Sequence, residues 1–470
     1  MNVLLIRPKM INTGLEFVSS QVPLNLCSLA AAVRDEVDEI RILDLEVERH
    51  TSGDYQRRLV DFEPDIIGIT VMTPTVPRAG RLAILSKEIL PDALVVAGGP
   101  HVSALPELTL EQYPAIDLCV CGEGETAFKK IVKKHHSRDF SDIPGVVFKD
   151  NSGAIHGNER CLTNEDIDSL PFAARDLLHF NKYRGQSYRG FSRDFLNIAE
   201  VATSRGCAGK CLFCAINVTH GRKVRFRSAE SVAAELEGLR KTYGINHVVF
   251  IDDTFTLNSK RLYKIMSSLR ELNITWNCTT RVDAVSDELL GDMVDFGCKG
   301  IAFGVESGSS RILDLIEKGV TTEQVKAAFR AAHKAGVEHI EADFMLGSHP
   351  SERLEDIEET RKLINLLHPT ILFLSVAVPY PGTPLWKIMK EENLIKTNAS
   401  WEDFLMYGGG DSWKTWYFTV GELRFLQRKI LREFYLSAGH IKQILGRISS
   451  FRQLLYYLRS GFSLLQGRLR

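Results

Sequence analysis

The feature that most constrains this chain is a group of three cysteines in one short stretch, Cys207, Cys211 and Cys214, with the spacing C-x-x-x-C-x-x-C. Thiolates are the usual ligands of iron–sulfur clusters, and a [4Fe–4S] cluster is commonly held by four of them. Three local thiolates leave one iron open to a substrate or cofactor. Positive charge and bare backbone N–H groups stabilise thiolates, and the motif supplies them in Arg205, Gly206, Gly209 and Lys210. The spacing therefore predicts a [4Fe–4S] site.

Structural zinc is the main alternative for these cysteines. Zinc sites usually pair ligands from two places in the chain, and the sequence offers no second C-x-x-C or H-x-x-x-H pair. Cys119 and Cys121 follow a different strand, while Cys278 and Cys298 read as small buried hydrophobes within or just before a strand. Nine unevenly placed cysteines in a chain of 470 residues do not resemble a disulfide framework either. The sequence favours the cluster over zinc.

Residues 1–140 alternate short apolar runs with amphipathic stretches such as Leu24–Val33, which is typical of a doubly wound α/β sheet. Strands that are apolar throughout suit a parallel sheet covered on both faces. Five such strands predict a flavodoxin-like order with ligands at their carboxyl ends. The expected strands are Val3–Ile6, Ile40–Leu43, Ile66–Val71, Leu94–Ala97 and Asp117–Val120.

Three of the turns that follow these strands contain glycine, threonine or both. Glycine lets the backbone approach a bulky ligand closely, although strand-to-helix turns often need it for tightness alone. Three such turns on one edge favour a ligand over three unrelated tight turns. The candidate ligand contacts are Thr70, Thr73, Gly98, Gly99, His101, Gly122, Glu123 and Gly124.

A second series of alternating strands and helices begins near residue 193, directly before the cysteines. Six units are too few for a complete eight-fold barrel, so we expect a partial (β/α)6 barrel, with its chemistry at the carboxyl ends of the strands. Ser228 is placed to cap one of its helices. The expected strands are Ile198–Thr203, His247–Ile251, Thr275–Thr279, Gly300–Val305, His339–Met345 and Ile371–Val376.

The stretch Ala202–Cys214, which follows a strand and opens this series, resembles the radical SAM superfamily. That resemblance implies that S-adenosylmethionine (SAM) binds the open iron and is cleaved to a 5′-deoxyadenosyl radical. It also implies SAM contacts. Phe213 would lie beside adenine, Arg281 would bind the methionine carboxylate, and Glu306 would bind the ribose. Gly347, in the stretch Phe344–Gly347, would present backbone to adenine.

The second strand of this series ends in Asp252 and Asp253, where many family members have Gly-Gly-Glu. The resemblance implies that this segment meets the methionine amino group, here with Asp252 and Asp253 in place of the usual residues. For every charged residue at a strand end, the alternative is a solvated or salt-bridged side chain.

A flavodoxin-like domain ahead of such a core is similar to the cobalamin-binding class of radical SAM enzymes. The resemblance implies a B12-binding domain at 1–140, a linker with a hairpin at 141–192, a radical SAM core at 193–396 and a basic helical region at 397–470. The glycine-containing turns would then hold cobalamin. The D-x-H-x-x-G motif, whose histidine ligates cobalt in other cobalamin proteins, is absent from the sequence. A purely structural first domain is the alternative.

The activity implied by the resemblance is transfer of a methyl group from methylcobalamin to an unactivated carbon, or to a phosphinate phosphorus, after hydrogen abstraction by the 5′-deoxyadenosyl radical. The chemistry would be anaerobic, with electrons from a flavodoxin or ferredoxin. One alternative is an oxidative cyclase or ring-rearranging enzyme acting on a tetrapyrrole or a hopanoid-type lipid. An alternative of another class is a cobalamin or cluster sensor without turnover.

The net charge and the hydropathy of the chain indicate which classes of partner it binds. A net charge of -1 argues against a nucleic-acid partner. The sequence shows no signal peptide and no apolar run long enough to span a bilayer, so we expect a cytoplasmic enzyme for a small-molecule or lipid substrate. The last residues, Arg447–Arg470, alternate basic and apolar side chains. They predict either a helix packed over the barrel opening or a peripheral contact with an anionic membrane.

Overall fold

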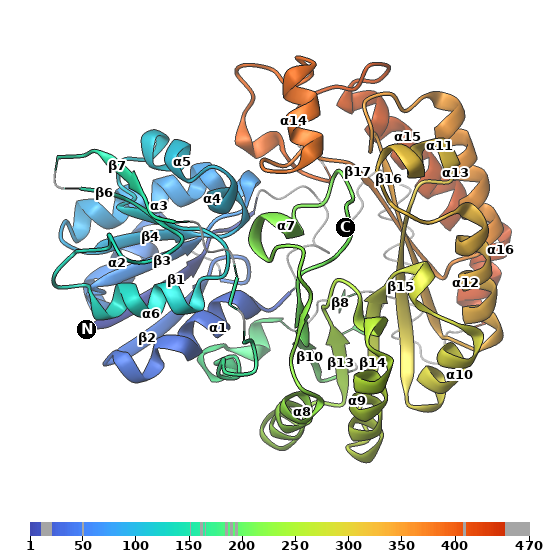
Figure 1. The fold of residues 1–470 in the computed structure, drawn as a ribbon, viewed down its shortest axis with the longest axis horizontal. Coiled ribbons are helices and arrows are strands. Elements are labelled where there is room, and N and C mark those ends of the chain that lie inside the picture. Colours follow the sequence, from blue (N-terminus) through green and yellow to red (C-terminus); the bar gives the residue numbers. More distant parts are fainter. Residues whose placement is uncertain are drawn as a thin grey trace.

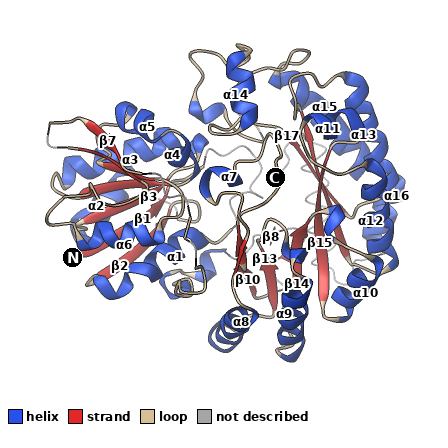
Figure 2. Cartoon of the chain, in the orientation of Figure 1, coloured by secondary structure: helices blue, strands red, loops and turns tan. Residues whose placement is uncertain are grey.

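The computed structural model describes residues 1–10, 21–48, 51–150, 152–159, 163–164, 166–183, 187–188, 191–192, 196–407 and 410–446. Two sheets, each covered by helices, lie side by side (Figure 1), and Figure 2 shows strands at the centre of both units. The short helix α7 (Ile216–Thr219) lies between them, and α14 (Pro384–Glu391) lies at the top of the same view. The predicted basic segment 447–470 falls outside the described residues.

The first sheet has the strand order β2-β1-β3-β4-β5-β6-β7. Its first five strands are parallel, which confirms the flavodoxin-like prediction. The predicted hairpin forms as β6 and β7 and pairs antiparallel with β5, so it extends this sheet instead of standing apart in the linker. The strands are β1 (Asn2–Arg7), β2 (Glu39–Asp44), β3 (Ile66–Thr70), β4 (Leu94–Gly98), β5 (Leu118–Val120), β6 (Val146–Lys149) and β7 (Ile155–Gly157).

Helices cover both faces of the first sheet and bury a separate core on each. One face carries α1 (Leu24–Val33) and α6 (Glu125–Lys133), while the other carries α2 (Ser52–Phe62) and α3 (Val76–Ile89). Two shorter helices, α4 (Pro100–Ala104) and α5 (Pro106–Gln112), follow β4. Coverage of both faces explains why these strands are apolar along their whole length.

The second sheet has six parallel strands in the order β10-β13-β14-β15-β16-β17, as a partial barrel requires. Along each strand, alternate side chains pack outward into one large apolar core. The side chains between them are often polar and face the concave side, for example Glu200, His247 and Asn277. The strands are β10 (Ile198–Val201), β13 (His247–Phe250), β14 (Thr275–Thr280), β15 (Cys298–Glu306), β16 (His339–Leu346) and β17 (Ile371–Val376).

Helices line the outer side of this sheet (Figure 1). Ser228 caps the first of them as predicted, because its side chain accepts a hydrogen bond from Ser231 N. They are α8 (Ala229–Tyr243), α9 (Ser259–Glu271), α10 (Asp287–Asp295), α11 (Ser310–Leu315), α12 (Thr322–Lys334), α13 (Leu354–Leu367), α15 (Val420–Tyr435) and α16 (Ala438–Leu445). Among the described residues, none of the helices has the length and apolar character needed to cross a bilayer.

Candidate active site between the two sheets

The cysteines lie in the loop that joins two short strands, β11 (Ser204–Arg205) and β12 (Arg225–Phe226), just after β10. The three thiols are free and only partly buried, whereas the other described cysteines are buried. A Cβ atom added to Gly209 would lie 3.3 Å from Cys207 Sγ and 3.8 Å from Cys211 Sγ, so backbone without a side chain passes close to both sulfurs. The structure therefore places the three thiols in one partly buried loop that follows the first barrel strand.

Two sets of contacts fix the cysteine loop, one where it leaves β11 and one near its middle. Gly206 has a φ of +89°, and a Cβ atom there would come within 2.4 Å of the Lys223 carbonyl oxygen, so only glycine fits this turn. Within the loop, Leu212 N donates to Ile316 O at 3.1 Å and Leu212 O accepts from Leu385 N at 2.9 Å. The cysteine loop is therefore anchored to the ends of α11 and α14.

Burial raises the pKa of the Cys214 thiol to about 12. Burial also raises the pKa of the Cys211 thiol, and the nearby Lys318 charge offsets only part of that rise. Binding a metal cluster requires the thiolates, so these thiols must lose protons when it binds. Three clustered thiols, a bare glycine backbone and a nearby cation fit an anionic iron–sulfur cluster. Among the described residues, no three His, Cys, Asp or Glu side chains are arranged to hold a single metal ion.

Glu306 ends β15 in an unusual backbone conformation, with a φ of +74° next to a shift in strand register. Such a bulge re-aims a side chain at a sheet edge. Its Oε1 accepts a hydrogen bond from Lys318 Nζ at 2.7 Å, and both side chains are largely buried. Burial alone would lower the pKa of Lys318, but the negative charges of Glu306 and Cys211 outweigh it and raise that pKa. Sequence reasoning did not identify Lys318.

Arg281 and Phe213 lie close to the same pair. The Arg281 guanidinium binds Asp283 through two hydrogen bonds of 2.8 and 2.9 Å and donates to Lys318 O at 3.0 Å. The Phe213 ring packs against the apolar side chains around α11. The structure thus brings Arg281, Glu306 and Phe213 together beside the cysteines, and it adds Lys318. Their roles as SAM contacts stay predictions.

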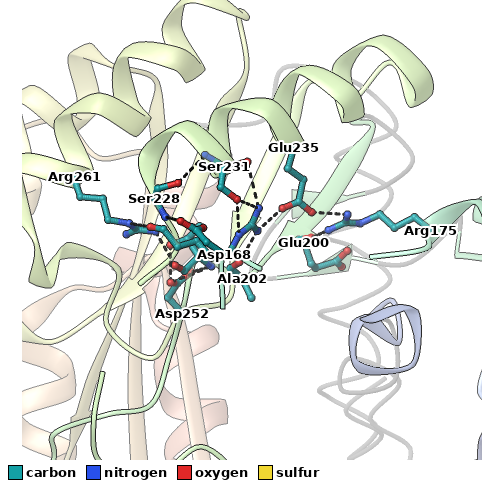
Figure 3. Close-up of polar contacts among 11 residues, drawn as sticks. Asp168, Arg175, Glu200, Ala202, Ser228, Ser231, Glu235, Asp252 and Arg261 are labelled. Atoms are coloured by element: carbon teal, nitrogen blue, oxygen red, sulfur yellow. Dashed lines mark hydrogen bonds and ion pairs between the residues drawn. The ribbon is translucent and has the colours of Figure 1, made fainter. Parts of the chain in front are cut away.

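Asp252 has partners within the protein (Figure 3). Its carboxylate is buried and accepts hydrogen bonds from Thr203 N at 3.1 Å, from Thr203 Oγ1 at 2.7 Å and from the Ser204 hydroxyl. Burial raises the pKa of Asp252 and these hydrogen bonds oppose the rise. These contacts fix the chain just before the cysteine loop and favour a structural role. Asp253 is exposed, and its contact with SAM stays a prediction.

The same close-up shows the contacts of the linker with α8 and β10. Arg175 Nη1 forms a buried ion pair with Glu235 on α8 at 2.6 Å, and its Nη2 donates to the Glu200 carbonyl oxygen of β10 at 2.7 Å (Figure 3). Asp168 accepts hydrogen bonds from Ser228 N, the capping residue of α8. The linker is therefore bound to the barrel by one buried ion pair and by an exposed carboxylate at the start of α8.

Gly347 also departs from the simple expectation. Its φ is +73°, and a Cβ atom would lie 2.7 Å from Leu423 Cδ1, so the position needs glycine. Its N–H is donated to Glu352, which also accepts from Ser348 N at 3.2 Å. Burial raises the pKa of the fully buried Glu352 to about 8. The Gly347 N–H therefore has a protein partner, and the contact of this segment with adenine stays a prediction.

The turns after β3, β4 and β5, which carry the predicted cobalamin contacts, meet at one edge of the first sheet, as expected. His101 Nδ1 lies 3.3 Å from Thr73 Oγ1, and Gly122 N donates to Ser103 Oγ at 2.9 Å. Gly99, next to Gly98 at the end of β4, has a φ of +111°, and a Cβ atom there would come within 2.8 Å of Val71 O. These close approaches join the turns after β3, β4 and β5 into one surface.

Three other contacts involve the predicted ligand edge. Thr70 Oγ1 accepts from Asn25 Nδ2 at 3.0 Å. A Cβ atom on Gly124 would lie 3.0 Å from Leu29 Cδ2, so this glycine allows α1 to pack closely. The Trp401 ring lies edge-on to His101 with centroids 4.8 Å apart, and burial lowers the pKa of His101 to about 4. A tryptophan from the far end of the chain thus covers part of this edge, which sequence reasoning did not foresee.

Glu123 is placed differently from its neighbours. Its side chain is fully buried, and its carboxylate accepts from both Arg225 Nη1 and Nη2, at 2.9 and 2.7 Å, and lies 2.8 Å from His220 Nδ1. Burial alone would raise the pKa of Glu123, but these groups hold it well below its usual range. The structure favours a role between the domains over the predicted direct contact with cobalamin.

Comparison with known proteins agrees with this arrangement. The family profile described as "B12 binding domain" matches residues 13–132, and the profile of the Radical SAM superfamily matches residues 201–364. An uncharacterized methyltransferase of Pyrococcus horikoshii is 36% identical over 417 residues, which is 88% of each chain. The chain belongs to the cobalamin-binding radical SAM family. Its cofactors are a [4Fe–4S] cluster, SAM and cobalamin, and the family requires an external electron donor.

Two further comparisons show more distant similarity. The anaerobic magnesium-protoporphyrin IX monomethyl ester cyclase of Cereibacter sphaeroides is 26% identical over 403 residues, covering 83% of this chain and 64% of the cyclase. The solved structure of the cobalamin-dependent SAM radical enzyme OxsB, with aqua-cobalamin and SAM bound, superposes with a TM-score of 0.73 at 20% identity. That match covers 99% of this chain and 71% of OxsB, and it shows the shared fold.

Proposed function

We propose that this protein is a methyltransferase that uses the 5′-deoxyadenosyl radical to abstract a hydrogen atom from a small-molecule substrate and replaces it with a methyl group. The acceptor is an unactivated carbon or a phosphinate phosphorus. The observation that carries the proposal is the position of the cysteine loop. Cys211 lies near enough to the Glu306–Lys318 pair to interact electrostatically with both charges, while Arg205 and His220, on either side of the cysteines, pair with Glu125 and Glu123 of the B12-binding domain. Radical generation and methyl supply then share one space.

We assign the cluster to Cys207, Cys211 and Cys214, and SAM to the adjacent group of Arg281, Glu306 and Lys318. SAM carries a carboxylate and an ammonium on its methionine end and two hydroxyls on its ribose. Two cations suit the carboxylate, and the Glu306 carboxylate suits a hydroxyl or ammonium donor. Phe213 supplies an apolar surface beside them. These residues bind and orient SAM and keep water from its sulfonium.

When bound, the three cofactors supply the radical and the methyl group of the reaction. The net reaction consumes the substrate, two molecules of SAM and two electrons. It yields the methylated product, S-adenosylhomocysteine, 5′-deoxyadenosine and methionine, so atoms and charge balance. The electrons come from outside the chain, and we propose a reduced flavodoxin or ferredoxin as their source. The protein itself contributes position, because a short radical lifetime demands that substrate and methyl donor be held close.

The turns of the first sheet hold cobalamin in this proposal. Gly98, Gly99, Gly122 and Gly124 lie in the turns at this edge, and Thr70 and Thr73 offer hydroxyls there. Burial keeps His101 neutral at pH 7, and Trp401 lies against it.

The comparisons favour methyl transfer over cyclisation. The relative named as a methyltransferase is 36% identical to this chain, whereas the cyclase of Cereibacter sphaeroides is 26% identical. An oxidative cyclase or ring-rearranging enzyme on a tetrapyrrole or hopanoid-type lipid is the second candidate, and the cyclase match supports it. A sensor without turnover is the third, since the same cofactor sites would serve one.

The test combines a spectrum with product masses. The anaerobically reconstituted protein should show the absorption of both a [4Fe–4S] cluster and cobalamin. With a reductant and SAM it should form 5′-deoxyadenosine, and its product should gain one methylene in mass. Insertion of oxygen or loss of hydrogens would instead establish the cyclase, and absence of 5′-deoxyadenosine would establish the sensor.

We further propose a cytoplasmic enzyme whose basic segment, residues 447–470, contacts an anionic membrane that presents a lipid substrate. This proposal rests on sequence alone, because the segment lies outside the described residues. Deleting it should abolish binding to anionic liposomes, and unchanged binding would refute the contact.

A further inference from the structure

We propose that Glu123 is a positioning residue that couples the cobalamin edge to the cysteine loop, so that filling one cofactor site strengthens binding at the other. The proposal goes beyond methyl transfer and rests on the proposed function only for the identity of the two cofactors. It concerns the distance and orientation between the two sites, and no contact of Glu123 with substrate or cofactor is invoked.

The first observation is the set of charges around Glu123. The residue follows β5 of the B12-binding domain and lies between Gly122 and Gly124, whose backbone forms the predicted cobalamin edge. Within the part of the chain that the structure describes, its cationic partners come from the other domain. Arg225 forms ion pairs with it at 2.7 Å, His220 at 2.8 Å and Arg205 at 3.3 Å.

These three partners enclose the cysteine loop in the sequence. Arg205 comes two residues before Cys207, on β11, while His220 and Arg225 come after Cys214, at the end of α7 and on β12. The two short strands pair antiparallel, with Arg205 opposite Arg225. The Glu123 carboxylate therefore binds both of the paired strands, β11 and β12, between which the cysteine loop lies.

A neighbouring carboxylate strengthens this junction. Arg205 Nη2 also forms an ion pair with Glu125 at 2.6 Å, and Asn164 N of the linker donates to Glu123 Oε2 at 2.8 Å. The Arg225 and Glu123 side chains are almost completely buried. Removing one partner from such a buried group leaves uncompensated charge, so the junction acts as a single unit.

An independent contact joins the next turn of the cobalamin edge to the same loop. The helix α7, which directly follows the cysteines, packs on α4, which follows Gly98 and Gly99. A Cβ atom on Gly382 would lie 3.0 Å from Val218 on α7 and 3.1 Å from Ala104 on α4, so three segments meet without a gap. Two turns of the cobalamin edge therefore contact the segments next to the cysteines. The turn at Gly122–Gly124 does so through ion pairs, and the turn at Gly98–Gly99 does so through the packing of α4 on α7.

Thermodynamic linkage then couples the binding of the cluster to the binding of cobalamin. A ligand that orders one side of a rigid junction lowers the cost of ordering the other side, and the coupling is the same in both directions. Cluster assembly fixes the cysteine loop and, through Glu123, the turn at Gly122 and Gly124. Cobalamin should therefore bind more tightly to the protein that carries its cluster than to the protein that lacks it. Couplings of this kind typically amount to roughly 5- to 150-fold in affinity.

The experiment measures the dissociation constant of hydroxocobalamin for the full chain before and after anaerobic reconstitution of the cluster, by equilibrium dialysis. The ratio of the two constants is the coupling. We expect a ratio of about 10 or more for the unaltered chain. Glu123→Gln, which keeps the size but removes the charge, should bring the ratio close to one, and Glu123→Asp should restore part of it.

Glu235→Gln is the matched control. Glu235 is about as buried as Glu123 and binds Arg175 and Arg227, but it lies on α8, and its ion pairs join α8 to the linker and to the segment before α8. This variant should lose stability like Glu123→Gln yet keep the full ratio. His220→Gln removes one partner from the loop side, and it serves if Glu123→Gln does not fold. It should lower the ratio without abolishing it.

The outcomes separate this proposal from the proposed function. Cobalamin binding with a ratio of one in the unaltered chain overturns the coupling alone, as does a full ratio in both Glu123→Gln and His220→Gln. Failure of the unaltered, cluster-loaded protein to bind cobalamin at all overturns both proposals. Equal loss of the ratio in Glu235→Gln shows that general destabilisation is responsible, and it refutes a specific role for Glu123.

Discussion

Lys318 Nζ donates a hydrogen bond to Glu306 Oε1 at 2.7 Å, and the two side chains form a largely buried ion pair beside Cys211. A Cβ atom on Gly304 would lie 2.8 Å from Glu306 Oε1 and 3.0 Å from Lys318 Nζ, so the strand β15 makes room for the pair with glycine. A buried pair is expensive to break from one side, because the remaining charge is left without a partner.

Replacing Lys318 with Met should weaken SAM binding by at least about tenfold, which corresponds to roughly 1.4 kcal/mol. The change removes a cation and leaves Glu306 buried without its partner. We expect the cluster content to stay close to normal, since Lys318 is not a ligand. The measurement is the dissociation constant of SAM for the reconstituted protein.

Lys326→Met is the control for this substitution. Lys326 lies on α12, where it pairs with the exposed Glu323, and its loss should leave SAM binding unchanged. Equal SAM affinities for Lys318→Met and the unaltered protein would remove Lys318 from the site.

Substituting Cys211 by Ala should abolish formation of 5′-deoxyadenosine and most of the cluster absorption, because the two remaining thiolates no longer hold the cluster stably in place. Cys298→Ala is the control, since this buried cysteine belongs to the barrel core. It should retain the cluster. Full 5′-deoxyadenosine formation by Cys211→Ala would show that the cluster assignment is wrong.

Gly206→Ala should prevent cluster assembly although the residue binds no iron. Its φ of +89° is unfavourable for alanine, and the new Cβ atom would collide with the Lys223 carbonyl oxygen at 2.4 Å. The cysteine loop would have to open where it leaves β11. Iron and sulfide analysis after reconstitution measures the effect.

The matched control is Gly238→Ala on α8, where nothing lies within 4 Å of the new methyl group. Alanine is the better helix former there and should stabilise the protein by about 0.5–1 kcal/mol. A normal iron content in Gly206→Ala would contradict the tight turn.

Glu352→Gln should make the stability of the fold less sensitive to pH between about 4.5 and 8. The pKa of Glu352 is raised from 4.5 to about 8, so the carboxyl is protonated in the fold at pH 7 but ionised in the unfolded chain. Its contribution is fully present below pH 4.5 and is lost as the pH rises towards 8. In that window the loss is about 1.4 kcal/mol per pH unit.

The amide of Glu352→Gln carries no charge at any of these pH values, and its oxygen still accepts from Gly347 N and Ser348 N. We therefore expect a smaller decline of the unfolding midpoint in guanidinium chloride between pH 5 and 8 than in the unaltered protein. Parallel declines would show that Glu352 is ionised in the fold.

The architecture was accessible from the sequence because its signals are local. Apolar runs marked the strands of both sheets, and their number predicted the flavodoxin-like order and the partial barrel. The spacing of Cys207, Cys211 and Cys214 lies within one loop, so no long-range contact was needed to recognise it. The cap at Ser228 was likewise set by residues within one turn of α8.

The partners of charged side chains were not accessible in this way. The sequence placed Glu123 at the correct edge of the first sheet, but its binding to Arg205, His220 and Arg225 depends on how the two domains pack. Asp252 was expected to face SAM, and its hydrogen bonds to Thr203 became visible only when β10 and β13 were paired.

By itself, then, the sequence determined the two α/β units, their order and the cluster motif, because each depends on residues that are near one another in the chain. Only the tertiary structure decided that Lys318 meets Glu306, that Trp401 covers His101 and that Glu123 joins the cobalamin edge to the cysteine loop. A charge or a ring acquires its role from the groups around it, and packing brings those groups from distant parts of the chain.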